Sequence, residues 1–391
     1  MTESPDLSGL FAPFQLKNVT LPNRIVMPAM GLEACSGGIP SPLVEDHCRD
    51  RVLGGTGLLM TEGVYIDHHS SGDNPVLGRF HGDDALRAWK GVVDAVHGVG
   101  GVIMPELWHV GMIYKTSDLM DGEQVRYRPE LRQVSPSGYI QPGKKVAEPM
   151  DEKDFEEVIE AYGIGADNAV RLGFDGIEIH AGHGYLIDQF FWKALNYRND
   201  HYGGSARNRG RFGAEVVAEI RRRVGPDMPI IMRISQWKLV DYGASIAETP
   251  RELEELLSLI VEAGVDLFDC SQRRFWEPTF RGSVLNLAGW TKKVTGLPTM
   301  TVGSVGLDQD MVQSFVEGGE AACNMASLYD LAERFSRGEF DLVGVGRALI
   351  ANAEWGNHVR NGDFHKLRPY NHLVLKHLRE ALDAAHADQK V

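Results

Sequence analysis

Cysteine is scarce in this sequence of 391 residues. Only four cysteines occur, and they stand far apart, with no Cys-x-x-Cys pair. Structural zinc sites and iron–sulfur clusters need closely spaced cysteine ligands, so the sequence predicts neither of them. Few and scattered cysteines are also typical of a reducing compartment, and we expect a cytoplasmic protein. The four are Cys35, Cys48, Cys270 and Cys323.

Long apolar runs and an excess of basic residues are absent as well. No run approaches the roughly 20 apolar residues of a membrane-spanning helix, and the start, MTESPD, does not resemble a secretory signal. Acidic residues outnumber basic ones by 54 to 40, which gives a formal charge of −14. Proteins that bind nucleic acid or anionic lipid carry basic patches. We therefore expect neither nucleic acid nor membrane among the partners.

The sequence instead alternates short apolar runs with charged segments of helical period. Continuous apolar runs of strand length are typical of parallel strands buried on both faces. Eight such runs alternate with helices, which favours a single-domain (β/α)₈ TIM barrel over residues 1–391. A doubly wound open sheet is the alternative, although no G-x-G-x-x-G follows the first strand. The eight runs begin near residues 24, 56, 101, 174, 229, 265, 298 and 341.

Three further segments extend beyond this repeat. Residues 111–150, after the third strand, are rich in Gly, Pro, Ser and Tyr and predict a lid over one end of the barrel. Residues 186–204 form a second insertion on the same face. Residues 356–391 read as a C-terminal helical tail.

The densest group of candidate catalytic residues follows the fourth strand, where barrel enzymes hold their active sites. His180, His183 and Tyr185 stand within six residues. They could be ordinary loop residues, or the histidines could share a metal with Asp175 or Glu178. The interpretation that fits best is a pair of hydrogen-bond donors that polarise a carbonyl oxygen, with a phenol as proton donor.

Glycines after the last two strands indicate a phosphate site. Barrels commonly bind phosphate in these two loops, and a guanidinium pairs well with phosphate. Arg233 lies within an apolar strand and needs an anionic or electron-rich partner, which an internal salt bridge would also provide. Together these features suggest a redox barrel with flavin mononucleotide (FMN). The phosphate-site candidates are Gly303, Ser304, Gly346 and Arg347.

Two strings then resemble a known family. The sequences HAGHGY at residues 180–185 and NYRNDHYGGSARNRGRF at residues 196–212 closely resemble the Old Yellow Enzyme family of FMN-dependent ene-reductases. The opening LFAPFQLKNVTLPNRIVMPAM at residues 10–30 is similar as well, and the resemblance extends to about residue 355. It implies that NAD(P)H reduces a bound FMN, which then reduces the activated C=C bond of an α,β-unsaturated carbonyl or nitro compound in a ping-pong reaction.

The resemblance also implies residue roles. His180 and His183 would hold the substrate oxygen, Tyr185 would donate the proton, and Arg233 would lie beside flavin N1 and O2. Trp108 would lie beside the substrate, and the phosphate candidates keep their role. Backbone positions along the flavin would be Ala29, Met30 and Gly63.

Three positions depart from the family pattern. Gly31 stands where relatives carry Thr or Cys, and Cys35 cannot be assumed to replace that side chain. Glu106 stands where a Gln usually meets the pyrimidine edge of the flavin, and a carboxylate offers no donor there. Met112 stands where some relatives have Arg.

The sequence leaves two questions open: the role of the residues at the mouth of the barrel, and the choice among alternative functions. Arg274 and Trp276, after the sixth strand, could shape the acceptor pocket, contact an NADPH phosphate or simply order a loop. The alternatives are a metal-dependent lyase or isomerase using His180 and His183, or a related flavin reductase that acts on nitrate esters or steroids. Relatives with an iron–sulfur cluster need a cysteine cluster that this chain lacks. A homo-oligomer is possible.

Replacement of Glu106 by Gln tests the charge at the flavin edge. We expect Glu106→Gln to raise the flavin reduction potential, because it removes a negative charge beside the anion that reduction creates. A redox titration of both proteins measures this, and an unchanged or lower potential in an FMN-loaded variant would contradict it.

Overall fold

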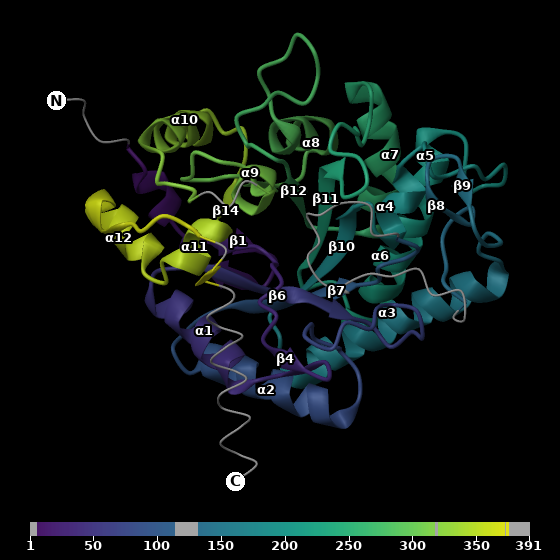
Figure 1. The fold of residues 1–391 in the computed structure, drawn as a ribbon, viewed down its shortest axis with the longest axis horizontal. Helices are drawn as coiled ribbons and strands as arrows, with labels where there is room; N and C mark the ends of the chain where they lie inside the picture. Colours follow the sequence, from purple (N-terminus) through teal and green to yellow (C-terminus); the bar gives the residue numbers. More distant parts are fainter. Residues whose placement is uncertain (1–5, 114–131, 317–319, 372, 375–391) are drawn as a thin grey trace.

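The computed structural model describes residues 6–113, 132–316, 320–371 and 373–374. Eight parallel strands form a closed barrel at the centre of the molecule, with helices around it (Figure 1). The strands follow one another around the barrel in chain order, and the last strand, β14, closes it against the first, β3. The predicted (β/α)₈ fold is confirmed. The strands are β3 (Ile25–Met27), β6 (Leu58–Tyr65), β7 (Ile103–Trp108), β10 (Ile177–His183), β11 (Ile230–Lys238), β12 (Leu267–Ser271), β13 (Thr299–Val302) and β14 (Leu342–Gly344).

Helices follow the strands and cover the barrel. Their bounds reflect local capping: α3 begins with a capping box at Asp151, and α3 and α7 both end at a left-handed glycine, Gly173 and Gly264. The longer helices are α1 (Pro42–Leu53), α2 (Asp83–His97), α3 (Glu152–Leu172), α6 (Arg211–Val224), α7 (Pro250–Ala263), α8 (Leu287–Thr295), α10 (Met325–Ser336) and α12 (Trp355–Asn361). Shorter ones are η1 (Ser8–Phe11), α4 (Leu186–Phe191), α5 (Ala206–Arg209), α9 (Met311–Val316), α11 (Arg347–Ala351) and η2 (Phe364–Lys366).

Alternate residues of each barrel strand face either the surrounding helices or the barrel interior. In β10, Ile177 and Ile179 belong to the large core between the strands and the helices, so Glu178 and His180 point to the opposite side, the barrel interior. The floor of this interior is apolar and is formed by side chains such as Met104 and Ile231. A hairpin of β1 (Phe14–Leu16) and β2 (Val19–Leu21) adds Leu16 and Leu21 to the same cluster. The interior is thus closed at one end by apolar packing and polar above it.

The predicted lid and tail lie partly outside the described residues. Of the lid, the structure describes 132–150, with a hairpin of β8 (Tyr139–Gln141) and β9 (Lys144–Lys145). Arg198, in the second insertion, donates to the carbonyls of Pro136 and Met150 at 2.8 and 2.9 Å. The described part of the tail includes α12 and Tyr370, which pairs with Ala321. A further hairpin, β4 (Cys35–Ser36) and β5 (Ile39–Pro40), follows the first barrel strand.

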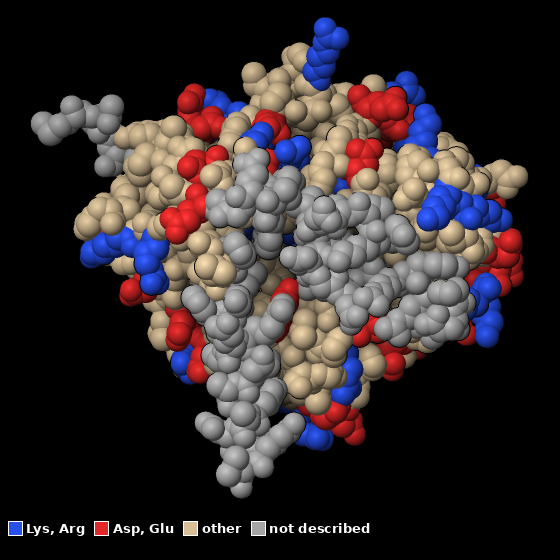
Figure 2. Space-filling view, viewed as in Figure 1, with Lys and Arg blue, Asp and Glu red and all other residues tan. Residues whose placement is uncertain are grey.

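Acidic and basic side chains are interspersed over the face in Figure 2, with no large basic patch visible there. Among the described helices, none is long and apolar enough to cross a membrane.

Candidate active site

A cavity of about 430 Å³ opens at the carboxyl ends of the barrel strands, the position that barrel enzymes use for catalysis. Most of the residues that the sequence singled out line it. These are Ala29, Met30, Gly31, Gly63, Glu106, Trp108, His180, His183, Tyr185, Arg233, Gly303, Ser304, Gly346 and Arg347. Chain segments more than 300 residues apart therefore meet at one site, as the barrel topology requires.

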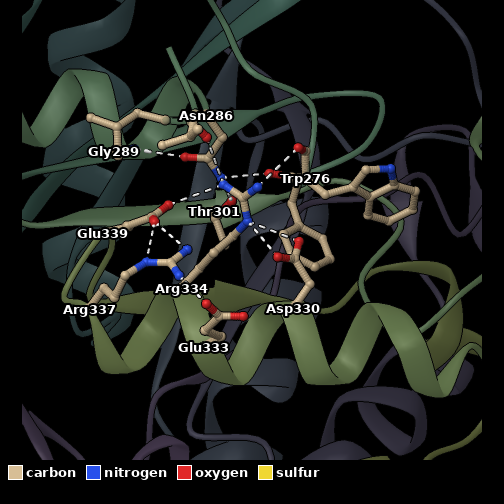
Figure 3. A network of polar contacts seen from close by, with 12 residues as sticks. Trp276, Asn286, Gly289, Thr301, Asp330, Glu333, Arg334, Arg337 and Glu339 are labelled. Atoms are coloured by element: carbon tan, nitrogen blue, oxygen red, sulfur yellow. Dashed lines mark hydrogen bonds and ion pairs between the residues drawn. The ribbon is translucent and has the colours of Figure 1, made fainter.

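Arg274 and Trp276 are not among the lining residues. Arg274 binds Glu277 at 2.9 Å and Asp310 at 3.0 Å. The carbonyl of Trp276 accepts from Arg334 on α10 at 3.2 Å, within the polar network of Figure 3. This contact anchors the loop that carries Trp276 to the outer helix.

The Arg334 network explains why that loop is held. Arg334 also binds Asp330 at 2.9 Å and Glu339 at 3.2 Å (Figure 3). In the same figure Asn286 donates to the hydroxyl of Thr301 at 3.0 Å. The bond between Asn286 and Thr301 joins the start of α8 to β13. Arg273, one residue before Arg274, lines the cavity.

Arg233 forms an ionic layer across the barrel interior. Its Nη1 donates to the Ala29 carbonyl at 2.9 Å and to Glu106 Oε1 at 3.1 Å, and its Nε lies 3.4 Å from Asp269 Oδ2. The partner that the sequence required is therefore a pair of buried carboxyl groups. Glu178, on β10 beside the Arg233 strand, is buried in the same interior, and neither its carboxyl oxygens nor those of Asp269 have a hydrogen-bond partner among the described residues.

The pKa shifts of the three carboxyl groups in this layer differ in direction and cause. Burial raises the pKa of Asp269 to about 7. Burial, and then the charge of Asp269, raise the pKa of Glu178 well above its usual value. Burial also acts on Glu106, but His180 and Arg233 outweigh it and hold the pKa of this carboxyl below its ordinary value. Glu106 is therefore the most acidic of the three carboxyl groups.

Four polar side chains make a continuous chain above this layer. His180 Nδ1 lies 2.7 Å from Glu106 Oε1, and His180 Nε2 lies 3.3 Å from His183 Nδ1. His183 Nε2 lies 3.1 Å from the hydroxyl of Ser271. Burial first, then the charges of Arg233 and His180, lower the pKa of His183 well below its ordinary value. His183 is therefore a neutral ring.

Tyr185 lies beside the chain. Its ring meets Trp108 edge-on at 4.8 Å and His180 at 5.0 Å between ring centroids. Burial, and then the charge of Glu106, raise the pKa of its hydroxyl. The phenol therefore stays protonated at neutral pH, as a proton donor must.

A buried ion pair holds the turn that carries these residues. His183 has a left-handed φ of 59°, and its N–H donates to Ser235 Oγ at 2.6 Å. The next N–H, of Gly184, donates to Asp188 at 2.7 Å, and Lys238 binds the other oxygen of Asp188 at 2.6 Å. Both side chains of that pair are fully buried, so the strained turn is fixed from two directions.

An aromatic wall extends from His183 towards the mouth. The rings of His183 and Trp237 are 4.4 Å apart, Trp237 stacks on Tyr242 at 4.9 Å, and the Arg273 guanidinium lies 5.6 Å over Tyr242. Sequence reasoning missed these three residues. Their only signal was their place near the ends of the fifth and sixth strands: Trp237 is at the end of β11, and Tyr242 and Arg273 lie in the loops after β11 and β12, where no periodic pattern identifies them.

The loops after the last two strands form a narrow cradle. Gly303 has a φ of 146°, and a Cβ there would lie 2.5 Å from the Gln272 carbonyl oxygen, so no other residue fits. Arg347 donates to the Gln309 carbonyl at 2.6 Å and to Ser304 Oγ at 3.1 Å. A glycine-lined loop and a guanidinium at the same end of the cavity fit a phosphate group, and the buried Arg233 fits an electron-rich ring edge.

The departures from the family pattern have local explanations. A Cβ at Gly31 would lie 3.3 Å from Leu77, so the neighbouring leucine occupies part of that space. The thiol of Cys35 donates to Glu62 at 3.1 Å, and Cys35 does not line the cavity. Met112 is buried, and its carbonyl accepts from Gln189 at 3.0 Å.

Among the described residues, one group of three side chains comes close enough together to hold a metal ion, namely His68, His69 and Glu157. It contains neither His180 nor His183, whose ring nitrogens lie against each other and against Glu106 and Ser271. The geometry thus lends no support to the metal-dependent alternative.

Comparison with known proteins decides the family. A model of the NADH:flavin oxidoreductase / NADH oxidase family matches residues 9–364, most of the chain. The chain belongs to this family. The predicted membership of the Old Yellow Enzyme group is confirmed, and the family implies an oxidoreductase that uses FMN and a nicotinamide nucleotide.

Individual relatives agree with this assignment. The NADH oxidase of Thermoanaerobacter brockii is 30% identical over 377 residues, which cover 94% of this chain and 52% of that protein. The 12-oxophytodienoate reductase 7 of Oryza sativa subsp. japonica is 36% identical over 58% of each protein. The chain thus spans little more than half the length of these two relatives. The Old Yellow Enzyme homologue of Zymomonas mobilis shares the fold, with a TM-score of 0.74 and 21% identity over 94% of this chain and 96% of that chain.

The Lys238–Asp188 pair yields a stability prediction. We expect Lys238→Met to lower the free energy of unfolding by about 3–5 kcal/mol, because it leaves Asp188 buried without a partner. Chemical denaturation followed by circular dichroism measures this. The double variant Lys238→Met/Asp188→Asn, which removes the unpaired charge, should recover part of the loss.

An exposed pair provides the control. Lys153 binds Glu157 at 3.2 Å on the surface of α3, and Lys153→Met should cost less than about 1 kcal/mol. Equal losses for the two lysine variants would show that the buried pair does not support the turn.

Proposed function

We propose that the protein reduces the activated C=C bond of α,β-unsaturated carbonyl or nitro compounds, with FMN as bound cofactor and NAD(P)H as hydride source. The observation that supports it is the convergence of His180, His183 and Tyr185 on one cavity above Arg233. The names of the relatives, an NADH oxidase and an oxophytodienoate reductase, agree with it.

The cofactor site is part of this proposal. Ala29, Met30, Gly31 and Gly63 would lie along the flavin ring, with Arg233 and Glu106 at its pyrimidine edge. Gly303, Ser304, Gly346 and Arg347 would hold the phosphate. When bound, the flavin accepts a hydride from the nicotinamide and supplies it to the acceptor.

The chain's own residues bind and protonate the acceptor. His180 and His183 would hold its oxygen, and donors at that oxygen stabilise the negative charge that develops there as the hydride arrives at the β-carbon. Tyr185 would supply a proton to the α-carbon. Trp108, edge-on to Tyr185, would bound the acceptor from the side and keep water away.

Spectroscopy on the purified protein tests the function. We expect bound FMN in equimolar amount, bleaching of its visible absorbance by NADH or NADPH without oxygen, and rapid reoxidation by an enone. Nitroalkenes, nitrate esters and steroid ketones in the same assay separate the related flavin reductases. A protein without flavin, or a reduced protein that an enone does not reoxidise, would refute the proposal, and metal analysis of the same sample tests the lyase alternative.

The role of Tyr185 can be isolated in a half-reaction. Tyr185→Phe should slow reoxidation by an enone by about 10²–10⁴-fold, the range that a positioned proton donor contributes, and leave reduction by NAD(P)H unchanged. Stopped-flow absorbance follows both steps. Tyr197→Phe, at a half-exposed tyrosine outside the cavity, is the matched control, and equal losses in both half-reactions of Tyr185→Phe would contradict the assignment.

A further inference from the structure

The guanidinium of Arg347 is largely used for contacts within the protein. Its Nη2 donates to the Gln309 carbonyl at 2.6 Å and to Ser304 Oγ at 3.1 Å. Its Nη1 donates to the Asp310 carbonyl at 3.0 Å and to Ser314 Oγ. These four bonds tie the side chain to residues 304–314, which follow β13. Of the five N–H groups of a guanidinium, only the one on Nε is left for a ligand.

The hydroxyl of Ser304 is bonded internally as well. It has one hydrogen to donate, and its acceptors are the carbonyls of Arg273 at 2.9 Å and Gln309 at 3.2 Å. Its own oxygen accepts from Arg347. The phosphate candidates with side-chain donors therefore leave one N–H between them. A phosphate group has several charged oxygens and is held by several donors, so a further donor is needed at this end of the cavity.

Tyr370 can supply such a donor. It is fully buried and lines the cavity, and its hydroxyl has no hydrogen-bond partner among the described residues. The guanidinium of Arg347 lies 5.8 Å over its ring, which places the phenol at the phosphate end. Burial raises the pKa of the hydroxyl, so it keeps its proton at neutral pH. A buried hydroxyl without a partner is costly, and a ligand oxygen would remove that cost.

Backbone bonds fix Tyr370 within a short segment, residues 367–371, which we call the C-terminal strap. The N–H of Tyr370 donates to the Ala321 carbonyl at 2.8 Å, and the N–H of Ala321 donates to the Tyr370 carbonyl at 2.9 Å. Asn352, just after α11, holds Arg368 on both sides. Its Oδ1 accepts from the Arg368 N–H at 2.8 Å, and its Nδ2 donates to the Arg368 carbonyl at 2.9 Å. The strap thus connects the end of α11 to the segment between α9 and α10.

We propose that the C-terminal strap is part of the cofactor site and that the hydroxyl of Tyr370 donates a hydrogen bond to the phosphate of FMN. The inference rests on the proposed function, which supplies the cofactor. Tyr370 and the Nε of Arg347 would then be side-chain donors to the phosphate, while the other N–H groups of Arg347 hold the loop in place. A flavin that lacks the phosphate would make no use of the Tyr370 hydroxyl.

An acidic side chain, Asp310, also lines this end of the cavity. Its carboxylate is bound by Arg273 at 2.8 Å and by Arg274 at 3.0 Å, and it accepts from the N–H of Gln313 at 3.1 Å. The two guanidinium groups offset its charge. The phosphate would therefore not face an unpaired anion.

The binding of FMN and of riboflavin, which lacks the phosphate, tests the role of Tyr370. The full-length protein is freed of flavin and titrated with each compound, and the quenching of flavin fluorescence gives the two Kd values. The wild type should bind FMN more tightly than riboflavin. We expect Tyr370→Phe to raise the Kd for FMN about 10–100-fold, the range of one hydrogen bond to a charged group, and to leave the Kd for riboflavin unchanged.

Tyr242→Phe is the matched control. Tyr242 also lines the cavity with a buried hydroxyl for which the described part of the chain offers no partner. It stacks on Trp237, on the side of the histidines. Its variant should keep the wild-type ratio of the two Kd values. The same selective loss of FMN in both variants would show that the effect does not come from the position of Tyr370.

A second variant tests the strap without touching Tyr370. Asn352→Ala removes both bonds to Arg368, and it should weaken FMN more than riboflavin because the phenol is no longer held in place. Wild-type affinity for FMN in this variant would overturn the role of the strap.

The two flavins also separate this inference from the proposed function. A wild type that binds FMN and riboflavin equally, or a Tyr370→Phe protein that loses affinity for both or for neither, overturns the phosphate contact and leaves the proposed function intact. A wild type that binds neither flavin overturns both.

Discussion

The structure depends on one guanidinium group placed inside a barrel. Arg233 lies in the interior with an apolar floor beneath it, where an unpaired charge is costly. The neighbouring strands supply the compensation, with Glu106 from β7 and Asp269 from β12. Since each strand contributes every second residue to the interior, these charges meet inside the barrel, and Trp108 and Ser271, two positions further along β7 and β12, line the cavity. The ionic layer thus lies at the base of the cavity, which Arg233 and Glu106 line.

The layer contacts the histidines above it through Glu106, which lies 2.7 Å from His180, and His180 in turn lies 3.3 Å from His183. The turn after β10 then needs its own support, because His183 has a left-handed backbone and its ring must still meet His180. The Lys238–Asp188 pair provides this support by binding the N–H of Gly184 through Asp188. The two buried ion pairs therefore have different effects: Arg233–Glu106 orients the ring of His180, and Lys238–Asp188 fixes the backbone that carries His183 and Tyr185.

The barrel and nearly half of the cavity-lining residues were predictable, because buried strands, helical stops and strand-end residues leave periodic or compositional signals. The partners of Arg233 were only partly predictable: Glu106 was assigned to the flavin edge, whereas its contact with His180 depends on how neighbouring strands align. Glu178 was considered only as a metal ligand, and Asp269 was not singled out. Arg274 and Trp276 were predicted at the mouth, whereas the neighbouring Arg273 lines the cavity. Trp237, at the end of β11, and Tyr242, in the loop after it, were missed because the apolar pattern of the strand does not extend to them.

The three carboxyl groups of the ionic layer do not ionise alike. Burial raises the pKa of Asp269 to about 7 and that of Glu178 well above its usual value. Glu106 is buried as well, but its contacts with His180 and Arg233 hold its pKa below the ordinary value. The negative charge of the layer is therefore favoured at Glu106, between the guanidinium and a histidine ring that lines the cavity. The carboxylate that departs from the family pattern thus joins the charge of the barrel interior to that ring.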